Sequence, residues 1–540
     1  MSLKKILKKL VLPVLLLIFC FVELNSLTKS YWLSSHDGVF HTLRIKEYYY
    51  ELTQGHFPVR WTTRLDNNYG IPLFNYVCPL PYLLSSLPLS FGLNERDAYK
   101  IVIFLSYFAG VLGFYFLNKN KNKFIAFISA MLYGLTPYLF LNIFVRGAFG
   151  EIVAMAIIPW LIYAFKSHKK ILSVITLSAL LLSHNFLGPI FLAFLIIYLV
   201  WTRNFNKNSL FGIIFALGLS AFFLLPMFFE KQYIVSGANN NFTFDYRQHF
   251  IYPQQLLYGK WDYWYSNPGP GDGMSFQLGF ANILIIFLSA LYLLIAKKRQ
   301  ELLFLFLATI FTLFLIVIYS QPLWQLITPL QIIQFPWRFL FLTTLLFPLM
   351  FSQIFNNSKI KNFIFKSKII PLLLLLLAFY NTRNYRRPME FQGPEKYQQW
   401  LDIYDHKTTT ASRDEVSPKW TTKEKFTGAS IRSSDKNTKI NYLNKNSSDI
   451  DFNIESTSSS TPITVLKNYF PGWSLINTDS KKTIEIFPDT DGNIQAQVSN
   501  GNYLLSYRGT KLQHLSNYLS LFTLVILLIS SIKIFSKKNE

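Results

Sequence analysis

Long apolar runs recur along the whole of this sequence, and they limit its possible folds more than any other feature. A helix needs about 20 mainly apolar residues to cross a bilayer, and twelve runs approach or reach that length. They lie at residues 10–24, 101–117, 124–142, 151–165, 171–183, 187–202, 209–229, 278–296, 301–320, 338–354, 369–380 and 515–532. Only 15% of the 540 residues are charged, against about 25% in soluble domains. We therefore predict a polytopic α-helical membrane protein with about 12 transmembrane helices.

Basic residues gather in the short segments between these runs. Seven such segments hold 22 Lys and Arg residues and one acidic residue, Glu540. This excess accounts for nearly all of the net charge of +23, and the positive-inside rule places these segments in the cytoplasm. The charge therefore indicates membrane orientation, and no nucleic-acid partner is predicted. We expect both the N-terminus and the C-terminus to be cytoplasmic.

One further apolar stretch, residues 76–92, is left out of this count. Pro79, Pro81 and Pro88 remove helical hydrogen-bond donors, so we predict a re-entrant or interfacial segment. A crossing there would also move the next basic segment to the outside. The first run lacks a small-residue cleavage site, and we expect it to remain as an anchor.

The predicted topology leaves three sizeable parts outside the membrane. They are a loop at 25–100, a second loop at 230–277 and a polar region at 381–513. We predict three domains: a multi-span membrane domain at 1–380, an extracytoplasmic domain at 381–513, and a last transmembrane helix with a basic tail at 514–540.

The polar region has the pattern of a small β-sandwich. It contains 15 of the 29 acidic residues and alternates in short stretches such as ITVLKNYF, KTIEIF, IQAQV and YLLSYRG, as strands do. Pairs of turn-forming residues separate these stretches. The pairs are Pro471 with Gly472, Asp491 with Gly492, and Asn500 with Gly501.

The first polar motif is SHDGVFHTLRIKEYYYELTQGHFPVRW at residues 35–61. Asp37, His41 and Arg44 are spaced i, i+4 and i+7, so a helix that begins near Asp37 places them on one side. Such a carboxylate could act as a general base beside an anion-binding cation. Asp37 could equally cap the helix only, with Arg44 neutralising it. A metal site built from His36, Asp37 and His41 lacks a fourth ligand, so neither a metal nor another cofactor is predicted.

The second motif is FVRGAFGEIVAMAIIPW, in which Arg146 and Glu151 lie on either side of a turn at Gly147 and Gly150. Glu151 begins the next helix, where the helix dipole favours a carboxylate. Two interpretations stay open. The two charges form a structural ion pair, or they face a cavity, as ionisable residues at membrane depth usually do.

Two more motifs are predicted to lie outside. LLSHNFLGP contains His184 and Asn185, and QIIQFPWRFL contains Gln334, Trp337 and Arg338. His184 could bond to a neighbouring helix or to a ligand. Trp337 and Arg338 are interpreted first as an interfacial anchor, with Trp at headgroup level and Arg reaching for phosphate, which makes a lipid phosphate a natural ligand. Weaker candidates are Asp245, Arg247, His249, Asp262 and Asp272.

The chain resembles the bacterial membrane proteins named for a "6-pyruvoyl-tetrahydropterin synthase-related domain". The resemblance rests on six segments in order: HDGVFHTLR, GHFPVRW, GIPLFNYVCPLPYLL, RGAFGE, SHN and QFPWR. The soluble pterin synthase needs a zinc-binding histidine set that this chain does not supply, so that activity is not carried over. The family's architecture is similar to that of GT-C glycosyltransferases. The resemblance covers roughly residues 25–355, and the PGW segment at 471–473 looks like the β domain that such proteins carry.

The resemblance implies sugar transfer, with inversion, from a polyprenyl-phosphate donor to an extracytoplasmic glycan, lipid or protein acceptor. Asp37 matches the first-loop carboxylate that serves as general base in GT-C enzymes. Many of those enzymes place a second acid beside the first, whereas here Gly38 follows. No divalent metal is therefore assigned. Membrane lipids and a lipid-linked sugar donor are the expected partners.

The leaving lipid phosphate would need cations. The candidates are Arg44, Arg146 and Arg338. Glu151 would be a catalytic-site residue that orients Arg146, and His41 or His184 would hydrogen-bond the sugar or phosphate. The predicted substrate and phosphate ligands are His41, Arg44, Arg146, His184, Asn185, Gln334, Trp337 and Arg338.

Two other classes of function stay open. A transporter or flippase of lipid-linked glycans could hold phosphate with the same arginines, and a non-catalytic envelope protein could bind polysaccharide through its β domain. A transporter is expected to carry polar groups through the midplane to the inner face. The motifs here cluster on the outer side instead, which favours chemistry there.

Overall fold

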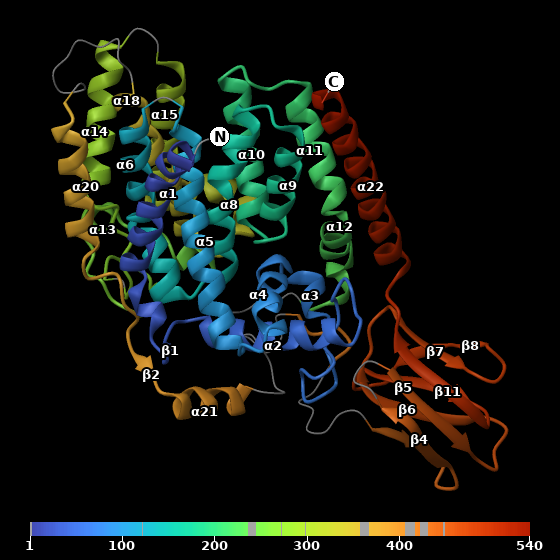
Figure 1. Cartoon of the computed structure of the whole chain (residues 1–540). Coiled ribbons are helices and arrows are strands. Elements are labelled where there is room, and N and C mark those ends of the chain that lie inside the picture. The colour runs from blue at the N-terminus through green and yellow to red at the C-terminus, as the bar shows by residue number, and fades with distance from the viewer. Residues whose placement is uncertain are drawn as a thin grey trace. The chain divides into compact units, whose positions relative to one another are not determined.

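In the computed structural model, helices make up most of the chain, and most strands lie between residues 431 and 507 (Figure 1). The structure describes residues 3–120, 122–235, 245–271, 273–296, 299–356, 367–404, 416–421, 430–445 and 449–539. The chain divides into two compact units. The first comprises Met1–His41, Leu87–Ala216 and Asn240–Tyr397, and the second comprises Thr42–Ser86, Leu217–Asn239 and Gln398–Glu540. The predicted domain boundaries at 380 and 513 stay predictions.

Each predicted apolar run coincides with a helix or with a bent pair of helices. In the first unit these are α1 (Leu3–Glu23), α5 (Glu95–Asn118), α6 (Lys123–Gly134) with α7 (Pro137–Phe140), α8 (Phe149–Lys166), α9 (Lys170–Leu181), α10 (Leu187–Trp201), α14 (Phe280–Ile295), α15 (Gln300–Ile316), α18 (Leu340–Phe355) and α20 (Ile369–Thr382). The run at 209–229 forms α11 (Lys207–Leu219) and α12 (Ala221–Phe229), and the last run lies in α22 (Lys511–Asn539). The prediction of a mainly helical protein is thus confirmed.

The number of crossings is a separate question. Among the described residues, four helices are long and apolar enough to cross a membrane, or up to six if each of two bent pairs is one span. Lys123–Gly134 and Pro137–Arg146 are bent by 44°, and Lys207–Leu219 and Ala221–Tyr233 by 67°. Six further apolar helices are shorter, so the count of about 12 spans stays a prediction. In the stretch at 76–92, α4 (Leu80–Ser90) rises only about 16 Å over its 11 residues.

Helices α5 and α8 pack closely, and this contact positions the chain around the site. Asn94 caps α5 by accepting a hydrogen bond from the Asp97 amide at 2.8 Å, as Asn commonly does. On the contact face, Gly113 leaves room for Trp160, since a Cβ there would lie 2.6 Å from the indole nitrogen. The Trp160 indole donates to the Ala109 carbonyl at 2.8 Å. Small residues on α5 therefore let α8 approach it closely.

The second unit contains two antiparallel sheets that share one hydrophobic core. The strands are β3 (Ile431–Ser433), β4 (Lys439–Lys445), β5 (Asp449–Glu455), β6 (Thr461–Asn468), β7 (Trp473–Asn477), β8 (Thr483–Ile484), β9 (Ile486–Pro488), β10 (Asn493–Val498) and β11 (Gly501–Tyr507). Their orders are β3-β6-β10-β9 and β4-β5-β11-β7-β8. Alternate residues of β5, namely Ile450, Phe452 and Ile454, face the core. The predicted C-terminal β region is confirmed, and its three turns carry Gly472, Gly492 and Gly501 at positive φ.

Part of the first external segment packs against this β core. Trp61 belongs to the core cluster and stacks on Tyr507 at 5.1 Å between ring centroids. The buried Lys467 ammonium on β6 donates to the Asn68 carbonyl at 2.8 Å. Asn468 donates to the Gly70 carbonyl at 2.8 Å. The chain around residues 61–70 is thus built into the β unit.

A buried polar cluster also lies within the second unit. Arg60 donates to three neutral oxygens: Asn75 Oδ1 at 3.2 Å, the Phe222 carbonyl at 2.8 Å and Asn517 Oδ1 at 2.7 Å. The Glu230 carboxylate accepts from three neutral groups: the Asn75 amide at 3.4 Å, the Gln513 amide at 2.7 Å and the Thr510 hydroxyl. Among the described residues, neutral groups thus bond to each charge, and Asn75 bonds to both.

Candidate functional site

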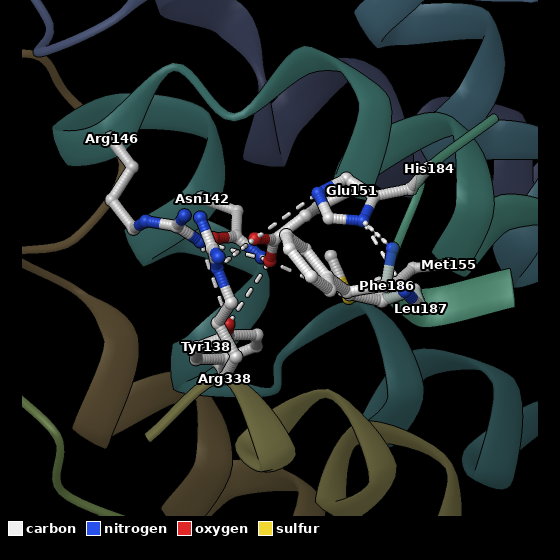
Figure 2. A network of polar contacts seen from close by, with 9 residues as sticks. All are labelled: Tyr138, Asn142, Arg146, Glu151, Met155, His184, Phe186, Leu187 and Arg338. Carbon is white, nitrogen blue, oxygen red and sulfur yellow. Dashed lines mark hydrogen bonds and ion pairs between the residues drawn. The ribbon is translucent and has the colours of Figure 1, made fainter. Parts of the chain in front are cut away.

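The site is built where the chain turns between α7 and α8 (Figure 2). After α7, the segment Leu141–Arg146 forms a single π-helical turn, a local widening often found at functional sites. Gly147 then takes a left-handed conformation, with φ of 66°. Glu151 follows in the first turn of α8 and is only 1% exposed. This reversal places Arg146 and Glu151 side by side, whereas the sequence left open whether the two charges form an ion pair or face a cavity.

One carboxylate oxygen of Glu151, Oε2, contacts three side chains from α7 and the π-helical turn after it. Arg146 Nη1 lies 2.9 Å from Glu151 Oε2. The Tyr138 hydroxyl donates to the same oxygen at 3.1 Å, and the Asn142 amide donates to it at 3.3 Å. Asn142 also accepts from Arg146 Nη1 at 2.5 Å. Asn142 thus bridges the acid and the guanidinium and fixes how they face each other.

The other oxygen of Glu151 faces Arg338. Arg338 Nε lies 3.3 Å from Glu151 Oε1, without forming a hydrogen bond. The guanidinium lies over the rings of Phe335, at 4.8 Å, and Phe186, at 5.4 Å, which are cation–π distances. Within the described part of the chain, the buried Nε and Nη1 atoms of Arg338 meet no hydrogen-bond acceptor. Buried N–H groups are nearly always paired, so these two nitrogens are an exception that needs a physical reason.

His184 approaches the same carboxylate oxygen with a defined tautomer. Its Nδ1 atom accepts from the backbone amides of Phe186 at 3.2 Å and Leu187 at 3.3 Å. Nδ1 is therefore unprotonated, and the neutral ring carries its proton on Nε2, which lies 3.7 Å from Glu151 Oε1. Burial lowers the pKa of His184 to about 4, although Glu151 opposes the shift. At neutral pH, His184 is thus an uncharged N–H donor.

Asp37 joins this group through the backbone. Its amide donates to the Arg146 carbonyl at 2.9 Å, and the His36 amide donates to the Val145 carbonyl at 2.9 Å. Gly147 permits this approach, because a Cβ there would lie 2.5 Å from Ser35 Oγ. The Asp37 carboxylate interacts electrostatically with both Arg146 and Arg338. The structure therefore brings the predicted base and two predicted cations together.

The helix predicted to begin near Asp37 is present as α2 (Gly38–Thr53). His41 is half-buried and lies between two aromatic rings, 5.6 Å from Phe149 and 6.5 Å from Tyr99. Arg44, one turn further along, is half-buried and belongs to the second unit. Its predicted role as a phosphate ligand stays a prediction.

Trp337 differs from the predicted interfacial anchor. The residue is 1% exposed, so it lies within the protein and does not face lipid headgroups. Its ring covers Arg146 at 4.7 Å, and its indole nitrogen donates to Ser266 Oγ at 3.2 Å. The anchor prediction was wrong because Trp337 packs under the second external loop. Asn185 and Gln334 are half-buried, and their predicted roles stay predictions.

The second external loop also contributes through His249, which bonds Ser266 Oγ at 3.0 Å. The weaker acidic candidates pair with neighbouring cations. Asp245 lies 2.8 Å from Arg247, and Asp262 lies 3.6 Å from Lys260. Asp272 lies outside the described residues. In the described ranges, no three His, Cys, Asp or Glu side chains group closely enough to hold a metal ion.

Sequence reasoning missed Tyr138 and Asn142. Both lie inside the apolar run at 124–142, where they were counted as part of a span. Their signal was available, since a polar residue inside a membrane segment usually has a partner. Asn142 precedes Arg146 by four residues, which places the two side chains on one face of a helix.

Comparison with known proteins places the chain in a family. Residues 74–385 match the family of membrane proteins described as "6-pyruvoyl-tetrahydropterin synthase related domain". The chain belongs to this family. The resemblance predicted from the sequence motifs is thus confirmed. The matched region contains Glu151, Arg146, His184 and Arg338, and it begins after Asp37.

Comparison with curated protein sequences gives no match. Among solved structures, the chain is similar to the cryo-EM structure of the arabinofuranosyltransferase AftD from Mycobacteria. The identity is 14% and the TM-score 0.42, over 73% of this chain and 28% of that one. The chain thus spans well under half the length of that protein.

Proposed function

We propose that this protein is a membrane glycosyltransferase that moves a sugar from a polyprenyl-phosphate donor to an extracytoplasmic acceptor. The observation that carries the proposal is the Arg338 guanidinium, whose buried Nε and Nη1 lack acceptors among the described residues. A phosphate oxygen would provide the missing acceptor. Arginine is well suited to this task because its planar fork matches phosphate geometry.

The proposed chemistry is inversion at the anomeric carbon. Asp37 would take the proton of the acceptor hydroxyl as that oxygen attacks the sugar. The bond between the anomeric carbon and the phosphate oxygen would break, and its electron pair would leave with the lipid phosphate. Arg338 and Arg146 would stabilise the developing negative charge. Glu151, which contacts both guanidinium groups, would hold them in place.

His184 would assist as a neutral donor. Its Nδ1 atom is occupied by two backbone amides, so only Nε2–H is available to a ligand or to Glu151. A neutral donor can bond to a phosphate oxygen or a sugar hydroxyl without adding a third positive charge. The proposal assigns no metal ligand, and Gly38 stands where many GT-C enzymes have a second acid.

The decisive experiment replaces the proposed base. Asp37→Asn keeps the size of the side chain and removes its basicity, so sugar transfer from a lipid-linked donor should fall by about 10²–10⁴. Asp97→Asn is the matched control, because Asp97 is another aspartate of the first unit, pairs with Arg96 and is not a candidate site residue, and it should leave transfer unchanged. The readout is the glycosylated product in membranes that contain equal amounts of each variant. Full transfer by Asp37→Asn would exclude Asp37 as the base.

A lipid-linked glycan flippase remains the second candidate, because the same buried Arg338 could hold phosphate without chemistry. The two functions differ in their product. A flippase would move the donor between leaflets and leave its sugar–phosphate bond intact, and Asp37→Asn would not change that movement.

A further inference from the structure

A long uncharged stretch precedes the site. Residues 302–337 contain no Asp, Glu, Lys, Arg or His, although they include the whole connection between two helices. After α15, this connection contains η7 (Ile318–Ser320), α16 (Gln321–Leu326) and α17 (Thr328–Gln331) before η8 (Pro336–Phe339). We call residues 318–333 the apolar connection. Connections that face water are normally polar, so this composition needs a physical reason.

Large apolar side chains project from the apolar connection. Leu326 is 81% exposed, Tyr319 71% and Ile332 61%. Single exposed apolar residues are common, but several within one short segment mark a surface that meets a membrane or another protein. The pattern therefore indicates a contact surface rather than a water-facing loop.

The apolar connection is held in place from its inner side. Trp324 is fully buried, and its indole nitrogen donates to the Leu315 carbonyl at 3.0 Å. The Gln331 amide donates to the Trp324 carbonyl at 3.0 Å. These bonds fix the conformation of the connection. In this conformation Trp324 is buried, and Leu326 and Ile332 are exposed.

The neighbouring helix indicates which partner this surface meets. Helix α15 has 17 residues and so rises about 26 Å, slightly less than the hydrocarbon thickness of about 30 Å. A connection that directly follows it lies at the boundary between acyl chains and headgroups. On α15 itself, exposed apolar residues continue toward the connection. They are Leu307, Ile310, Phe311 and Phe314.

We propose that the apolar connection lies in the surface of the lipid bilayer, with Leu326 and Ile332 against acyl chains. Lipid fits better than a protein partner because the surface has no charge to set specificity and continues the apolar face of α15. The connection leads to Phe335, whose ring lies 4.8 Å from the Arg338 guanidinium. The membrane contact therefore extends to the edge of the candidate site.

The test uses single labels on the full chain in vesicles of phosphatidylcholine and phosphatidylglycerol. The two natural cysteines, Cys20 and Cys78, are buried and can stay in place. Leu326→Cys carries an environment-sensitive fluorophore, and lipids with a nitroxide on the acyl chain act as quenchers. Leu443→Cys is the matched control, since Leu443 on β4 is also an exposed leucine, at 62%. We expect several-fold stronger quenching at position 326 than at position 443.

Equal quenching by lipid at both positions, together with equal quenching by aqueous iodide, would overturn the proposal. Disulfide-linked dimers formed through position 326 would also overturn it, because they would indicate a second copy of the chain as the partner. Ile332→Cys provides an independent site on the same connection and should behave as Leu326→Cys does. It keeps the test decisive if one labelled variant folds poorly.

Discussion

Two buried charge clusters in this protein use opposite ways of satisfying their charges. In the second unit, the partners of Arg60 among the described residues are neutral oxygens and those of Glu230 are neutral donors, with Asn75 bonded to both. In the first unit, Glu151 faces Arg146, Arg338 and His184 directly. There, among the described residues, Arg338 keeps two buried nitrogens without acceptors.

The difference separates a structural cluster from a ligand site. A buried polar network whose members are all satisfied adds rigidity, whereas a partly satisfied one costs stability unless a ligand completes it. The Arg60 cluster therefore holds its unit together. The proposed function would have the Arg338 cluster receive an anion. Substitutions that act differently on the two clusters test this contrast.

The largest effect is expected from the two central acids. Glu151→Gln leaves two buried guanidinium groups without their counter-charge, and breaking such an arrangement costs about 3–5 kcal/mol. Glu230→Gln keeps hydrogen-bonding capacity among neutral partners, and the cost should be about 1–3 kcal/mol. The measurement is thermal unfolding of both purified variants in the same detergent. Equal losses would remove the distinction between the clusters.

The arginines should show the contrast in the opposite sense. Arg60→Met leaves three acceptors without a donor, of which only Asn75 Oδ1 is fully buried, so a total loss of about 1–3 kcal/mol is expected. Arg338→Met removes a cation whose own hydrogen bonds are incomplete and leaves Glu151 paired with Arg146, so stability should fall less than in Arg60→Met. Donor binding should nevertheless be lost. A strongly destabilised Arg338→Met protein would make Arg338 a structural residue.

The third effect concerns pH. The pKa of His184 is lowered by burial to about 4, below the ordinary value of about 6.5. Between these values the unfolded chain takes up a proton that the folded protein does not, so stability should fall as the pH drops from 6.5 to 4. The loss attributable to His184 is roughly 2–3 kcal/mol.

Melting temperatures measured across this pH range test the effect. His184→Asn should flatten the dependence, although part should remain because burial also lowers the pKa of His36. An unchanged slope in His184→Asn would show that this imidazole is not kept neutral by burial.

The smallest effect is expected at Tyr138. Tyr138→Phe removes one hydrogen bond to the Glu151 carboxylate, and a bond to a charged group contributes about 1.5–3 kcal/mol. The ring and its packing stay. A stability loss near the lower end, measured by thermal unfolding, is expected because Arg146 and Asn142 still bond to the same oxygen. No loss at all would mean that the hydroxyl is not bonded to Glu151.

Sequence patterns predicted the parts of this protein that depend on local periodicity. Apolar runs predicted the helices, and alternation with turn residues predicted β6, β10 and β11. Asp37 was recognised from its helical spacing with His41 and Arg44. Arg146 was recognised as a charge at membrane depth, and Arg338 from its place beside Trp337. Their mutual distances were not predictable, because they depend on how the separate helices pack.

The failures have the same physical origin. Trp337 suits a headgroup region and a buried site equally well, and only the packing of the second external loop decides between them. Likewise, Lys467 contacts Asn68 from about 400 positions away in the sequence. No local pattern reports such a pairing, so the inclusion of residues around 61–70 in the β unit could not be foreseen.

The turn at Gly147 sets a limit on how this site can vary. A single methyl group there would lie 2.9 Å from the Gly38 nitrogen, and the positive φ would add strain for any side chain. Either effect would push the segment around Asp37 away from the Arg146 carbonyl. In relatives that work by the same chemistry, the residues around this turn can vary. Position 147 should remain glycine.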